Sequence, residues 1–539
     1  MINGAEIMIN AIKNEGVDVV FGYPGAAICP FFDAAYRDDD FRAILVRQEQ
    51  NAGHAASGYA RSTNKVGVCV VTSGPGATNL VTAIATAYLD SVPMVAITGQ
   101  VNSWLIGRDA FQEADITGSC EPFTKHSYLV KNAEDLPRIM KEAFHIARTG
   151  RPGPVLIDVP MDVQLAAVQN PKYPETIDIM GYKPSFEGNK FQIKKACEVI
   201  RNSKRPIILA GGGLFLSDGA VKAINHIVDK TGIPTICTMM GIGGLQSKHP
   251  LNLGMVGMHG TAAANIAIKK ADTILICGAR MGDRTLPNSE KINEHTKVIH
   301  IDVDPAEIGK NSPYAIPIVG DLGSVLGHIS KEIEYTCPAQ WANECVANKK
   351  EKIFDQSEDK LDPKYFISRL TEKLDRDCIY CADVGQNQIW SANGHKIREG
   401  RFLTSGGMGT MGYSLPAAIG AKVGNPDKQC IAVCGDGSFQ MQFMEIATMI
   451  QHGVDVKIIV MRNGDLGMVR ELQDNVYKGR HSVVDLFGSP DFQVLAQAYG
   501  IECMRIDKTA QVESAIEQLV NSKGPFLLEC VISPEERSL

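Results

Sequence analysis

An acidic residue and an amide residue, Asp436 and Asn463, stand near the two ends of the stretch GDGSFQMQFMEIATMIQHGVDVKIIVMRNGD. Two oxygen ligands that together carry one negative charge suit Mg2+, which takes one or two protein oxygens along with phosphate and water. Gly-Asp-Gly alone is an ordinary turn from a strand to a helix, and Asn463 alone is an ordinary loop residue. Their combination at the two ends of one stretch favours a site that binds magnesium and phosphate.

The residues around this pair predict the elements that would position it. Residues 430–434 and residues 456–461 are short apolar runs, each typical of a buried strand. Between them, apolar residues recur at helical spacing, and Gly453 predicts the end of a single helix; these residues are Phe439, Phe443, Met444, Ala447 and Ile450. The unit is therefore β-α-β with parallel strands, so that Asp436 and Asn463 follow the carboxyl ends of nearby strands, where open α/β sheets bind ligands.

Length and element order predict a large α/β protein. A chain of 539 residues is too long for one core, and strands alternate with helices from end to end. We expect three doubly wound parallel-sheet domains, at residues 1–165, 190–340 and 362–539. The first and third share a plan of strand, glycine-rich turn and helix, seen in TSGPGATNL and TSGGMGTMGYSLPAAIGA. These two are expected to be related domains that flank a third.

Charge and composition exclude several classes of protein. The 54 basic and 61 acidic residues are mixed along the chain, with no basic stripe that would indicate nucleic-acid binding. The amino-terminal residues lack the regions of a signal peptide, and no run of about 18 apolar residues predicts a membrane span. We therefore expect a cytoplasmic protein. Its fourteen cysteines are expected to be buried thiols, and the only CxxC, Cys378 to Cys381, is expected to pack in a core.

A glycine-rich segment, Gly407 to Gly412, matches the pattern GxGxxG. A lone match is a weak signal for dinucleotide binding, and the acidic residue that follows at Asp427 lies in a turn rather than at a strand end. We favour close approach of backbone to a phosphorylated cofactor, with NAD binding as the less favoured alternative. No GxxxxGK[ST] occurs, which excludes a P-loop.

Several motifs together resemble the large catalytic subunit of acetohydroxyacid synthase (acetolactate synthase), a thiamine-diphosphate-dependent enzyme. They are the GDG…N unit itself, RQEQNAGHAASGYAR, TSGPGATNL, PMVAITGQV, DAFQEADITG, GMVGMHGTAAAN, GARMGDRT, SGGMGTMGYSLPAAIGA and LGMV. They occur in the family's order over nearly the whole chain. The resemblance implies a pyrimidine-binding first domain, a central domain of FAD- or nucleotide-binding type, and a diphosphate-binding third domain.

This resemblance implies roles for individual residues around thiamine diphosphate. Asp436, Asn463 and the carbonyl of Asp465 would hold Mg2+ against the diphosphate. Glu49 would share a proton with the far nitrogen of the cofactor's aminopyrimidine, which then removes a carbon-bound proton from the cofactor itself. The other residues implied at the cofactor are Gln112, Pro24, Gly25, Thr72, Asn79, Gly407, Met408, Met411 (which would prop the cofactor into its bent form), Gly435, Gly437, Ser438, Gly467 and Met468.

The same resemblance implies the reaction, a second cofactor and an assembly. Pyruvate would lose CO2, and its two-carbon unit would join a second 2-keto acid bordered by Phe111, Met258, Leu472 and Arg284, whose guanidinium would pair with the carboxylate. FAD without a redox role would bind the central domain at Gly212, Gly213, Thr238, Met239, His259, Gly278, Arg280, Asp302, Val303 and Asp321. The expected product is 2-acetolactate, a precursor in branched-chain amino acid biosynthesis. The expected partners are a second copy of the chain, as a homodimer or a dimer of dimers, and a small regulatory subunit.

Four positions depart from the family's pattern. Gln48 replaces a histidine, Arg462 an asparagine, Glu121 an arginine and Leu472 a tryptophan. The chain also ends at SPEERSL, so a tail that helps to cover the active site is expected to be reduced. These differences leave open another thiamine-diphosphate-dependent 2-keto acid decarboxylase or an acetyltransferase of the same architecture. A non-catalytic nucleotide-binding or regulatory protein is disfavoured by the presence of Glu49, Asp436 and Asn463.

Overall fold

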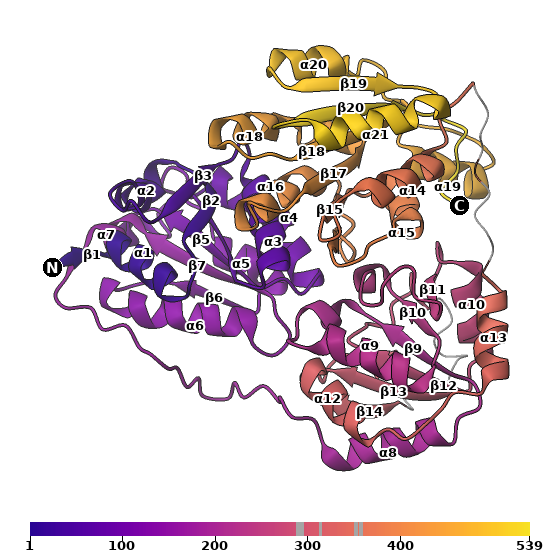
Figure 1. The fold of residues 1–539 in the computed structure, drawn as a ribbon. Helices are drawn as coiled ribbons and strands as arrows, with labels where there is room; N and C mark the ends of the chain where they lie inside the picture. Colours follow the sequence, from indigo (N-terminus) through magenta and orange to yellow (C-terminus); the bar gives the residue numbers. More distant parts are fainter. Residues whose placement is uncertain (287–295, 312–314, 350–353, 355–358) are drawn as a thin grey trace.

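Three six-stranded parallel sheets, each covered by helices on both faces, make up the computed structural model (Figure 1). The model describes residues 1–286, 296–311, 315–349, 354 and 359–539. Every pair of neighbouring strands within the three sheets is parallel. The predicted fold class, three α/β parallel-sheet units, is confirmed.

The first sheet lies between two layers of helices. Its strand order is β3 (Arg42–Leu45), β2 (Val19–Tyr23), β4 (Gly67–Val71), β5 (Met94–Gln100), β7 (Pro154–Pro160) and β6 (His126–Leu129). One face packs on α1 (Gly4–Asn14), α2 (Cys29–Tyr36) and α6 (Leu136–Arg148). The other face packs on α3 (Glu49–Thr63), α4 (Pro75–Leu89) and α5 (Ile116–Cys120). The two separate apolar cores are those of a doubly wound domain.

The third sheet repeats the strand order of the first. It runs β16 (Arg401–Leu403), β15 (Ile379–Ala382), β17 (Cys430–Gly435), β18 (Lys457–Arg462), β20 (Phe526–Val531) and β19 (Glu502–Ile506). Its faces are covered by α14 (Pro363–Lys373), α15 (Gln386–Gly394) and α21 (Val512–Asn521), and by α16 (Ser414–Gly424), α18 (Ile446–His452) and α20 (Phe492–Ala498). The shared order confirms that the first and third sections have one plan.

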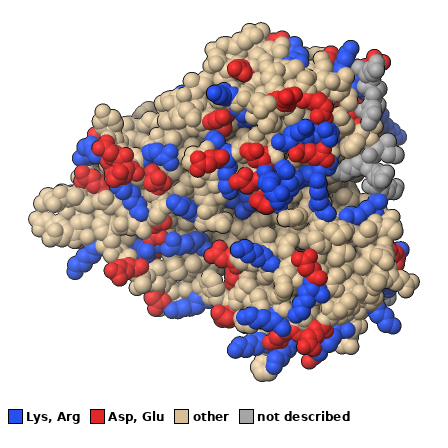
Figure 2. All heavy atoms as spheres, viewed as in Figure 1, with Lys and Arg blue, Asp and Glu red and all other residues tan. Residues whose placement is uncertain are grey.

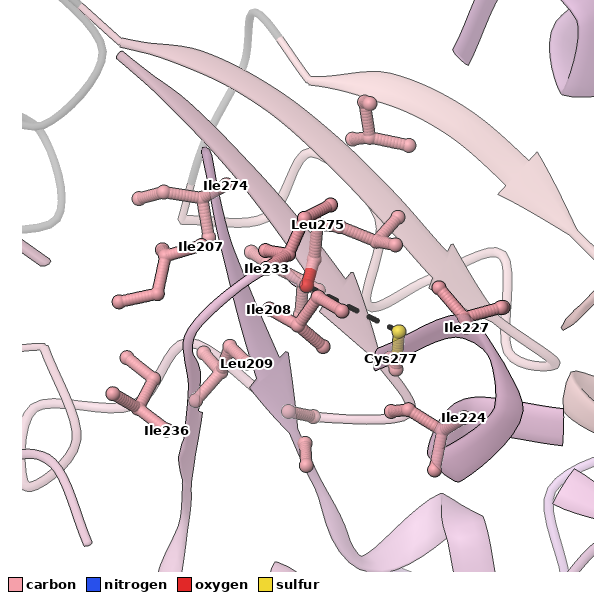
Figure 3. Close-up of a cluster of buried hydrophobic side chains, with 14 of the residues drawn as sticks. Ile207, Ile208, Leu209, Ile224, Ile227, Ile233, Ile236, Ile274, Leu275 and Cys277 are labelled. Atoms are coloured by element: carbon pink, nitrogen blue, oxygen red, sulfur yellow. Dashed lines mark hydrogen bonds between the residues drawn. The ribbon is translucent and has the colours of Figure 1, made fainter. Parts of the chain in front are cut away.

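The central sheet has a different order, with a reversal at its middle. It runs β11 (Asn252–Met255), β10 (Thr235–Cys237), β9 (Pro206–Ala210), β12 (Thr273–Cys277), β13 (Lys297–Asp302) and β14 (Ile316–Val319). It is covered by α8 (Lys190–Arg201), α9 (Ala220–Thr231), α10 (Ala262–Lys270) and α12 (Leu322–Glu332), with α13 (Ala339–Ala347) beside α10. Figure 3 shows β-branched side chains of β9, β12 and α9 packed together, with Cys277 among them. Burial raises the pKa of this thiol, so the sulfur acts as an apolar core group.

The predicted helix between β17 and β18 is wrong as a single element. The structure has a short helix, α17 (Asp436–Phe439), then a 3-10 turn (Phe443–Glu445) and α18. The break turns two polar side chains inward: Gln442 donates to Asp383 (2.9 Å), and Glu445 accepts from the backbone N–H of Arg47 (2.9 Å). These buried hydrogen bonds hold the interrupted path. Gly453, at φ 64°, ends α18 as predicted.

The first and third domains are in contact along helices α3 and α16. Small residues form this α3–α16 interface. All α3 residues from Asn51 to Arg61 are buried. A Cβ atom added to Gly58 would lie 1.9 Å from the carbonyl oxygen of Ala417, and one added to Gly420 would lie 1.8 Å from that of Ala55. The two backbones are therefore in direct contact, and only glycine fits at either crossing position.

The connection to the central domain is long and irregular. After β8 (Ala167–Val168), which pairs antiparallel with β1 (Ile2–Asn3), residues 169–189 form no helix or strand before α8 begins (Figure 1). This segment matches the polar, proline- and tyrosine-rich linker expected there.

Charged side chains of both signs are interspersed over the face shown in Figure 2. That face therefore carries no stripe of a single sign. Within the described residues, no helix combines the length and the apolar character that crossing a bilayer requires.

Candidate active site and cofactor cavity

Asp436 follows the carboxyl end of β17 and is 2% exposed. Its Oδ2 accepts from the backbone N–H of Gly464 at 2.8 Å, and its Oδ1 accepts from that of Gly437 at 3.0 Å. Burial raises the pKa of this carboxyl group to about 6. No lysine, arginine or histidine among the described residues forms an ion pair with it. A buried carboxylate that faces only neutral donors has room for a bound cation.

Asn463 follows β18, the strand beside β17, so the two predicted ligand residues stand on neighbouring strands as expected. Its Nδ2 donates to Oε1 of Gln386 at 3.1 Å, and its Oδ1 accepts from the N–H of Asp465 at 3.1 Å. The Asp465 carboxylate instead forms an ion pair with Arg470. The Asp465 carboxylate is thus occupied by Arg470, which is compatible with the expected use of the backbone carbonyl rather than the side chain. The amide and carboxylate oxygens together fit Mg2+.

Small residues pack around this pair. Ser438 Oγ donates to the Gly435 carbonyl (3.1 Å), and a Cβ atom on Gly437 would lie 3.5 Å from Met411 Cε. A Cβ atom on Gly467 would lie 2.5 Å from Asn463 Nδ2, so a side chain there would displace the amide. The structure thus brings the expected diphosphate-binding residues into one group, the third-domain cluster: Met411, Gly435, Asp436, Gly437, Ser438, Asn463, Asp465 and Gly467.

Arg462, one of the four departures, turns away from this cluster. Its guanidinium donates to Oε1 of the fully buried Glu529 at 2.8 Å and stacks over the ring of Phe492. Arg505 donates to the other Glu529 oxygen at 2.7 Å. The substitution therefore supports a buried ion pair beneath the sheet edge and leaves the Asp436 carboxylate without a cationic partner.

Glu49 is the first residue of α3, and Gln48 caps that helix by accepting from the N–H of Asn51 at 3.3 Å. Glu49 Oε2 accepts from Nδ2 of Asn79, on α4, at 3.0 Å. A Cβ atom on Gly76 would lie 3.5 Å from Glu49 Oε1, which places the carboxylate against the glycine-rich loop before α4. Gln48 thus serves as a helix cap, and Glu49 remains positioned by Asn79.

The same loop gathers the other residues expected in the first domain. A Cβ atom on Gly25 would lie 2.5 Å from Thr72 Cγ2, and a Cβ atom on Gly74 would lie 2.9 Å from Gln112 Cβ. Among the residues that the structure describes, none hydrogen-bonds the buried hydroxyl of Thr72, so its hydrogen-bonding capacity is unused. Pro24 directly precedes Gly25 in the turn after β2. We call Pro24, Gly25, Glu49, Thr72, Asn79 and Gln112 the first-domain cluster.

The two clusters belong to different domains of the chain. No hydrogen bond between described residues joins a member of the first-domain cluster to a member of the third-domain cluster. Each cluster holds some of the groups that the sequence analysis expects around one cofactor.

The central domain borders a cavity of about 630 Å3 that reaches the first and third domains. All ten residues expected to contact FAD line it: Gly212, Gly213, Thr238, Met239, His259, Gly278, Arg280, Asp302, Val303 and Asp321. A Cβ atom on Gly213 would lie 2.8 Å from Gly278 Cα, so the loops after β9 and β12 pack backbone to backbone. This volume lies within the usual range for a cofactor or ligand pocket.

The position of the cavity follows from the topology. The strand order reverses between β9 and β12, and the cavity residues follow the carboxyl ends of β9, β10, β12, β13 and β14. Asp302 ends β13, and burial raises its pKa to about 6; Asp321 caps α12 by accepting from the N–H of Ser324 at 3.0 Å. An acid at a strand end beside a reversal is the usual place for a ribose hydroxyl.

Comparison with known proteins assigns all three domains. The family model "Thiamine pyrophosphate enzyme, N-terminal TPP binding domain" matches residues 2–119, the central-domain model matches residues 193–329, and the C-terminal TPP binding domain model matches residues 383–530. The probable acetolactate synthase large subunit of Methanocaldococcus jannaschii is 46% identical over 99% of this chain and 93% of its own length. The chain belongs to the acetolactate synthase large-subunit family.

Two further relatives agree with this assignment. The acetolactate synthase large subunit of Corynebacterium glutamicum is 42% identical over 99% of the chain and 87% of its own length. The acetolactate synthase isozyme 2 large subunit of Escherichia coli is 41% identical over 99% of the chain and 96% of its own length. As a member of this family the chain is a thiamine-diphosphate-dependent enzyme of the carboligase type.

The structure brings together only two of the four residues that were expected to border the second substrate of an acetolactate synthase. Met258 and Arg284 lie side by side, with the Met258 N–H donating to the Arg284 carbonyl (3.0 Å) and Arg284 Nη1 lying 3.1 Å from Met258 Sδ. Leu472 is 53% exposed on α19 (Gly467–Tyr477), and Phe111 is 88% exposed on the loop after β5. Met258 and Arg284 are thus in contact with each other, whereas the side chains of Leu472 and Phe111 are exposed.

Three residues that the sequence analysis expected at the cofactor, Gly407, Met408 and Met468, lie outside the third-domain cluster. Gly407 and Met468 line the large cavity, and the N–H of Gly407 donates to Asp90 Oδ1 at 2.7 Å. Met408 is 44% exposed beside Gly407. The GxGxxG loop that begins at Gly407 therefore packs against the first domain and borders the large cavity.

Sequence reasoning missed several charged residues on the cavity wall, among them Arg61, Asp90, Arg151 and Arg401. Arg151 forms an ion pair with Glu307 at 3.1 Å, and Arg401 stacks on the ring of Phe215 at 4.2 Å. Arg61 ends the motif RQEQNAGHAASGYAR, but nothing in the motif indicates that its side chain reaches a cavity beside another domain. Glu121, by contrast, is exposed and does not line the cavity.

Proposed function

We propose that this chain is an acetolactate synthase that removes CO2 from pyruvate and joins the two-carbon unit to a second 2-keto acid. The preferred second substrate is pyruvate, and the product is 2-acetolactate, a precursor of branched-chain amino acids. The observation that carries the proposal is the presence of both cofactor-binding clusters, each with its charged residue positioned, in a chain that matches acetolactate synthase large subunits over 99% of its length.

When bound, thiamine diphosphate would supply a nucleophilic carbon and an electron sink for the bonding electrons that stay behind when CO2 leaves pyruvate. The third-domain cluster supports its binding through Mg2+, with Asp436, Asn463 and the Asp465 carbonyl as protein ligands. Glu49, held by Asn79, would exchange a proton with the far ring nitrogen of the aminopyrimidine. Gln112 would lie beside the reacting carbon, and Arg284 would pair with the substrate carboxylate.

We propose that the working enzyme is a homodimer, or a dimer of dimers, in which Glu49 of the first domain and the diphosphate-binding residues of the third domain come from two different chains at each site. The names of the relatives specify a large subunit, which supports a small regulatory subunit as a further partner. We retain residues 1–165, 190–340 and 362–539 as the proposed domain boundaries and the cytoplasm as the proposed location.

The competing function is another thiamine-diphosphate-dependent decarboxylase or an acetyltransferase of the same architecture, since Leu472 and Arg462 depart from the family's pattern. Pyruvate incubated with the chain, thiamine diphosphate, Mg2+ and FAD distinguishes them. Acetolactate as the main product supports the proposal. Acetaldehyde without acetolactate identifies a decarboxylase. If no CO2 is released from pyruvate, the chain is neither an acetolactate synthase nor a pyruvate decarboxylase.

FAD is the proposed occupant of the large cavity, bound without a redox role. We expect purified protein to be yellow and its flavin spectrum to persist during pyruvate turnover. Asp302→Ala should weaken FAD binding about 10–100-fold, since a hydrogen bond to a charged group is worth about 1.5–3 kcal/mol. Flavin fluorescence titration measures this affinity.

The matched control for this variant is Asp229→Ala, which removes an exposed aspartate of the same domain. Colourless protein that is fully active and binds no added FAD would contradict the flavin assignment. Equal FAD affinity in Asp302→Ala and Asp229→Ala would contradict only the role given to Asp302.

Leu472 is expected to weaken the preference for the larger second substrate. One methylene in an apolar pocket changes binding by about 1–3 kcal/mol, and a leucine covers less of it than the tryptophan found in the family. We expect little preference for 2-ketobutyrate over pyruvate in the native protein, and an increase of about 5-fold or more in Leu472→Trp. Competition between equal concentrations of the two keto acids gives the ratio of acetohydroxybutyrate to acetolactate.

The control for this experiment is Val494→Trp, which adds the same side chain at an exposed position on α20. A strong 2-ketobutyrate preference in the native protein, or the same product ratio in Leu472→Trp and Val494→Trp, would show that another residue shapes the pocket.

A further inference from the structure

The loop between β5 and α5, residues 101–115, carries both Phe111 and Gln112 and contains only one short 3-10 turn, Ser103–Leu105. Gln112 adopts a left-handed backbone conformation (φ 59°), and its backbone packs directly on Gly74, where an added Cβ would lie 2.9 Å from the Gln112 carbonyl oxygen. A non-glycine residue keeps such a conformation only where its surroundings impose it. The position of Gln112 therefore depends on what holds the ends of this loop.

A single buried amide side chain joins the two ends of the loop. Gln100, the last residue of β5, is 4% exposed. Its Oε1 accepts from the N–H of Val101 at 2.9 Å, and its Nε2 donates to the carbonyl of Ala114 at 2.9 Å. The same Nε2 donates its second hydrogen to Oδ2 of Asp158 at 2.9 Å. Both hydrogens of the Nε2 group are thus used, one to bind the end of the loop and one to bind the sheet.

Asp158 is the residue of the sheet to which Gln100 is hydrogen-bonded. It lies on β7, directly opposite Thr98 of β5, and is 2% exposed. Thr98 Oγ1 donates to Asp158 Oδ1 at 2.7 Å, which leaves Oδ2 turned toward Gln100. Both residues belong to the sheet rather than the loop, so the loop is tied to a rigid element.

The backbone partners of Gln100 determine the orientation of its side-chain amide, that is, which atom is the oxygen and which is the nitrogen. A reversed amide would place its NH2 group against the Val101 N–H and its oxygen against the Ala114 carbonyl, and both contacts would be repulsive. The Asp158 atom facing Nε2 must therefore be a hydrogen-bond acceptor. Burial raises the pKa of Asp158 to about 7, yet a proton on Oδ1 would point at Thr98 and leave Oδ2 still accepting. The geometry requires an acceptor at this position and does not require a charge.

We propose that Gln100 and Asp158 are positioning residues that anchor residues 101–115 to the sheet and thereby hold Gln112 in place for the reaction. The anchor itself rests on the contacts above, whereas its effect on turnover rests on the proposed function of Gln112. Neither residue would touch the substrate or the cofactor.

Four substitutions test the anchor in the full-length protein. Asp158→Asn can keep the geometry, because its Oδ1 can accept from Gln100 while its Nδ2 donates to Thr98 Oγ1. Asp158→Leu removes the acceptor at similar volume, and Gln100→Leu removes the bridging amide. Gln100→Glu keeps the acceptor for Val101, removes the amide donor and places a second carboxyl group beside Asp158, so it also breaks the anchor and carries the test if Gln100→Leu fails to fold.

Backbone hydrogen–deuterium exchange of residues 101–115, measured without cofactor, is the first readout. We expect exchange at least about 10-fold faster in Asp158→Leu and in the Gln100 variant than in the native protein, with Asp158→Asn within about 3-fold of native. The second readout is kinetic: kcat/KM should fall about 10–100-fold in the same loosened variants and be rescued in Asp158→Asn, because a misplaced group near the reacting atoms has effects of this size.

Unchanged exchange in the Gln100 variant would overturn the proposal, and so would exchange in Asp158→Asn as fast as in Asp158→Leu, because the charge rather than the acceptor would then be required. Faster exchange with unchanged kcat/KM would overturn the link to Gln112. Failure of the native protein to form acetolactate would refute the proposed function and leave the exchange comparison intact, so the two failures are distinguishable.

Discussion

Asp436→Ala is expected to lose thiamine diphosphate, with affinity reduced more than about 100-fold. Asp436 is the only carboxylate among the proposed metal ligands, and replacing even a group that supports a ligand lowers metal affinity about 10–100-fold. The variant also leaves the N–H groups of Gly437 and Gly464 without their acceptor, so the loops that would hold the diphosphate lose a common attachment. Isothermal titration with thiamine diphosphate in the presence of Mg2+ measures the loss.

Asp427→Ala is the matched control, because Asp427 is an exposed aspartate of the same domain. Both variants should fold, as circular dichroism can verify, since alanine relieves the cost of burying an unpaired carboxyl group at position 436. Cofactor affinity in Asp436→Ala equal to that in Asp427→Ala would mean that the cation is held elsewhere.

Glu49→Gln is expected to retain the cofactor but to slow loss of its reactive carbon-bound proton by about 10²–10⁴-fold, the usual contribution of general acid–base catalysis. Glutamine can still accept from Asn79, so the start of α3 should keep its position. It cannot exchange a proton with the aminopyrimidine nitrogen. Deuterium exchange at the reactive carbon of the bound cofactor reports this step without any substrate.

Glu121→Gln provides the control, since Glu121 is exposed in the same domain. Normal deuterium exchange in Glu49→Gln, together with normal exchange in Glu121→Gln, would show that Glu49 has been assigned the wrong role. Loss of cofactor binding in Glu49→Gln alone would instead point to a structural contribution.

The parts of the site that sequence could predict are those encoded locally. Asp436 and Asn463 follow two strands that pair in the expected parallel register, because the apolar runs before them are buried and short. The acids and glycines that the resemblance implied in the central domain likewise lie at the ends of strands or shortly after them. In such cases the distance along the sequence fixes the position in the fold.

Contacts between distant segments could not be predicted in the same way. The helix expected through Phe443 is broken because Gln442 and Glu445 bond to Asp383 and Arg47, which lie far away in the sequence. Gln100 and Asp158 also meet only through the pairing of β5 with β7. Hydrophobic periodicity carries no information about buried polar partners, so tertiary hydrogen bonds overrode the local pattern.

The glycine crossings of α3 and α16 have a mechanical consequence. A hinge needs room for one surface to slide or rotate on another, and backbones in direct contact through Gly58 and Gly420 leave none. The first and third domains of a chain therefore move as one block, and Glu49 at the start of α3 keeps a constant relation to that block. Opening of the site for substrate entry must instead come from exposed elements such as α19, which has no buried residue. The contact between α3 and α16 is thus rigid within each chain, and the motion that admits substrates takes place in exposed elements.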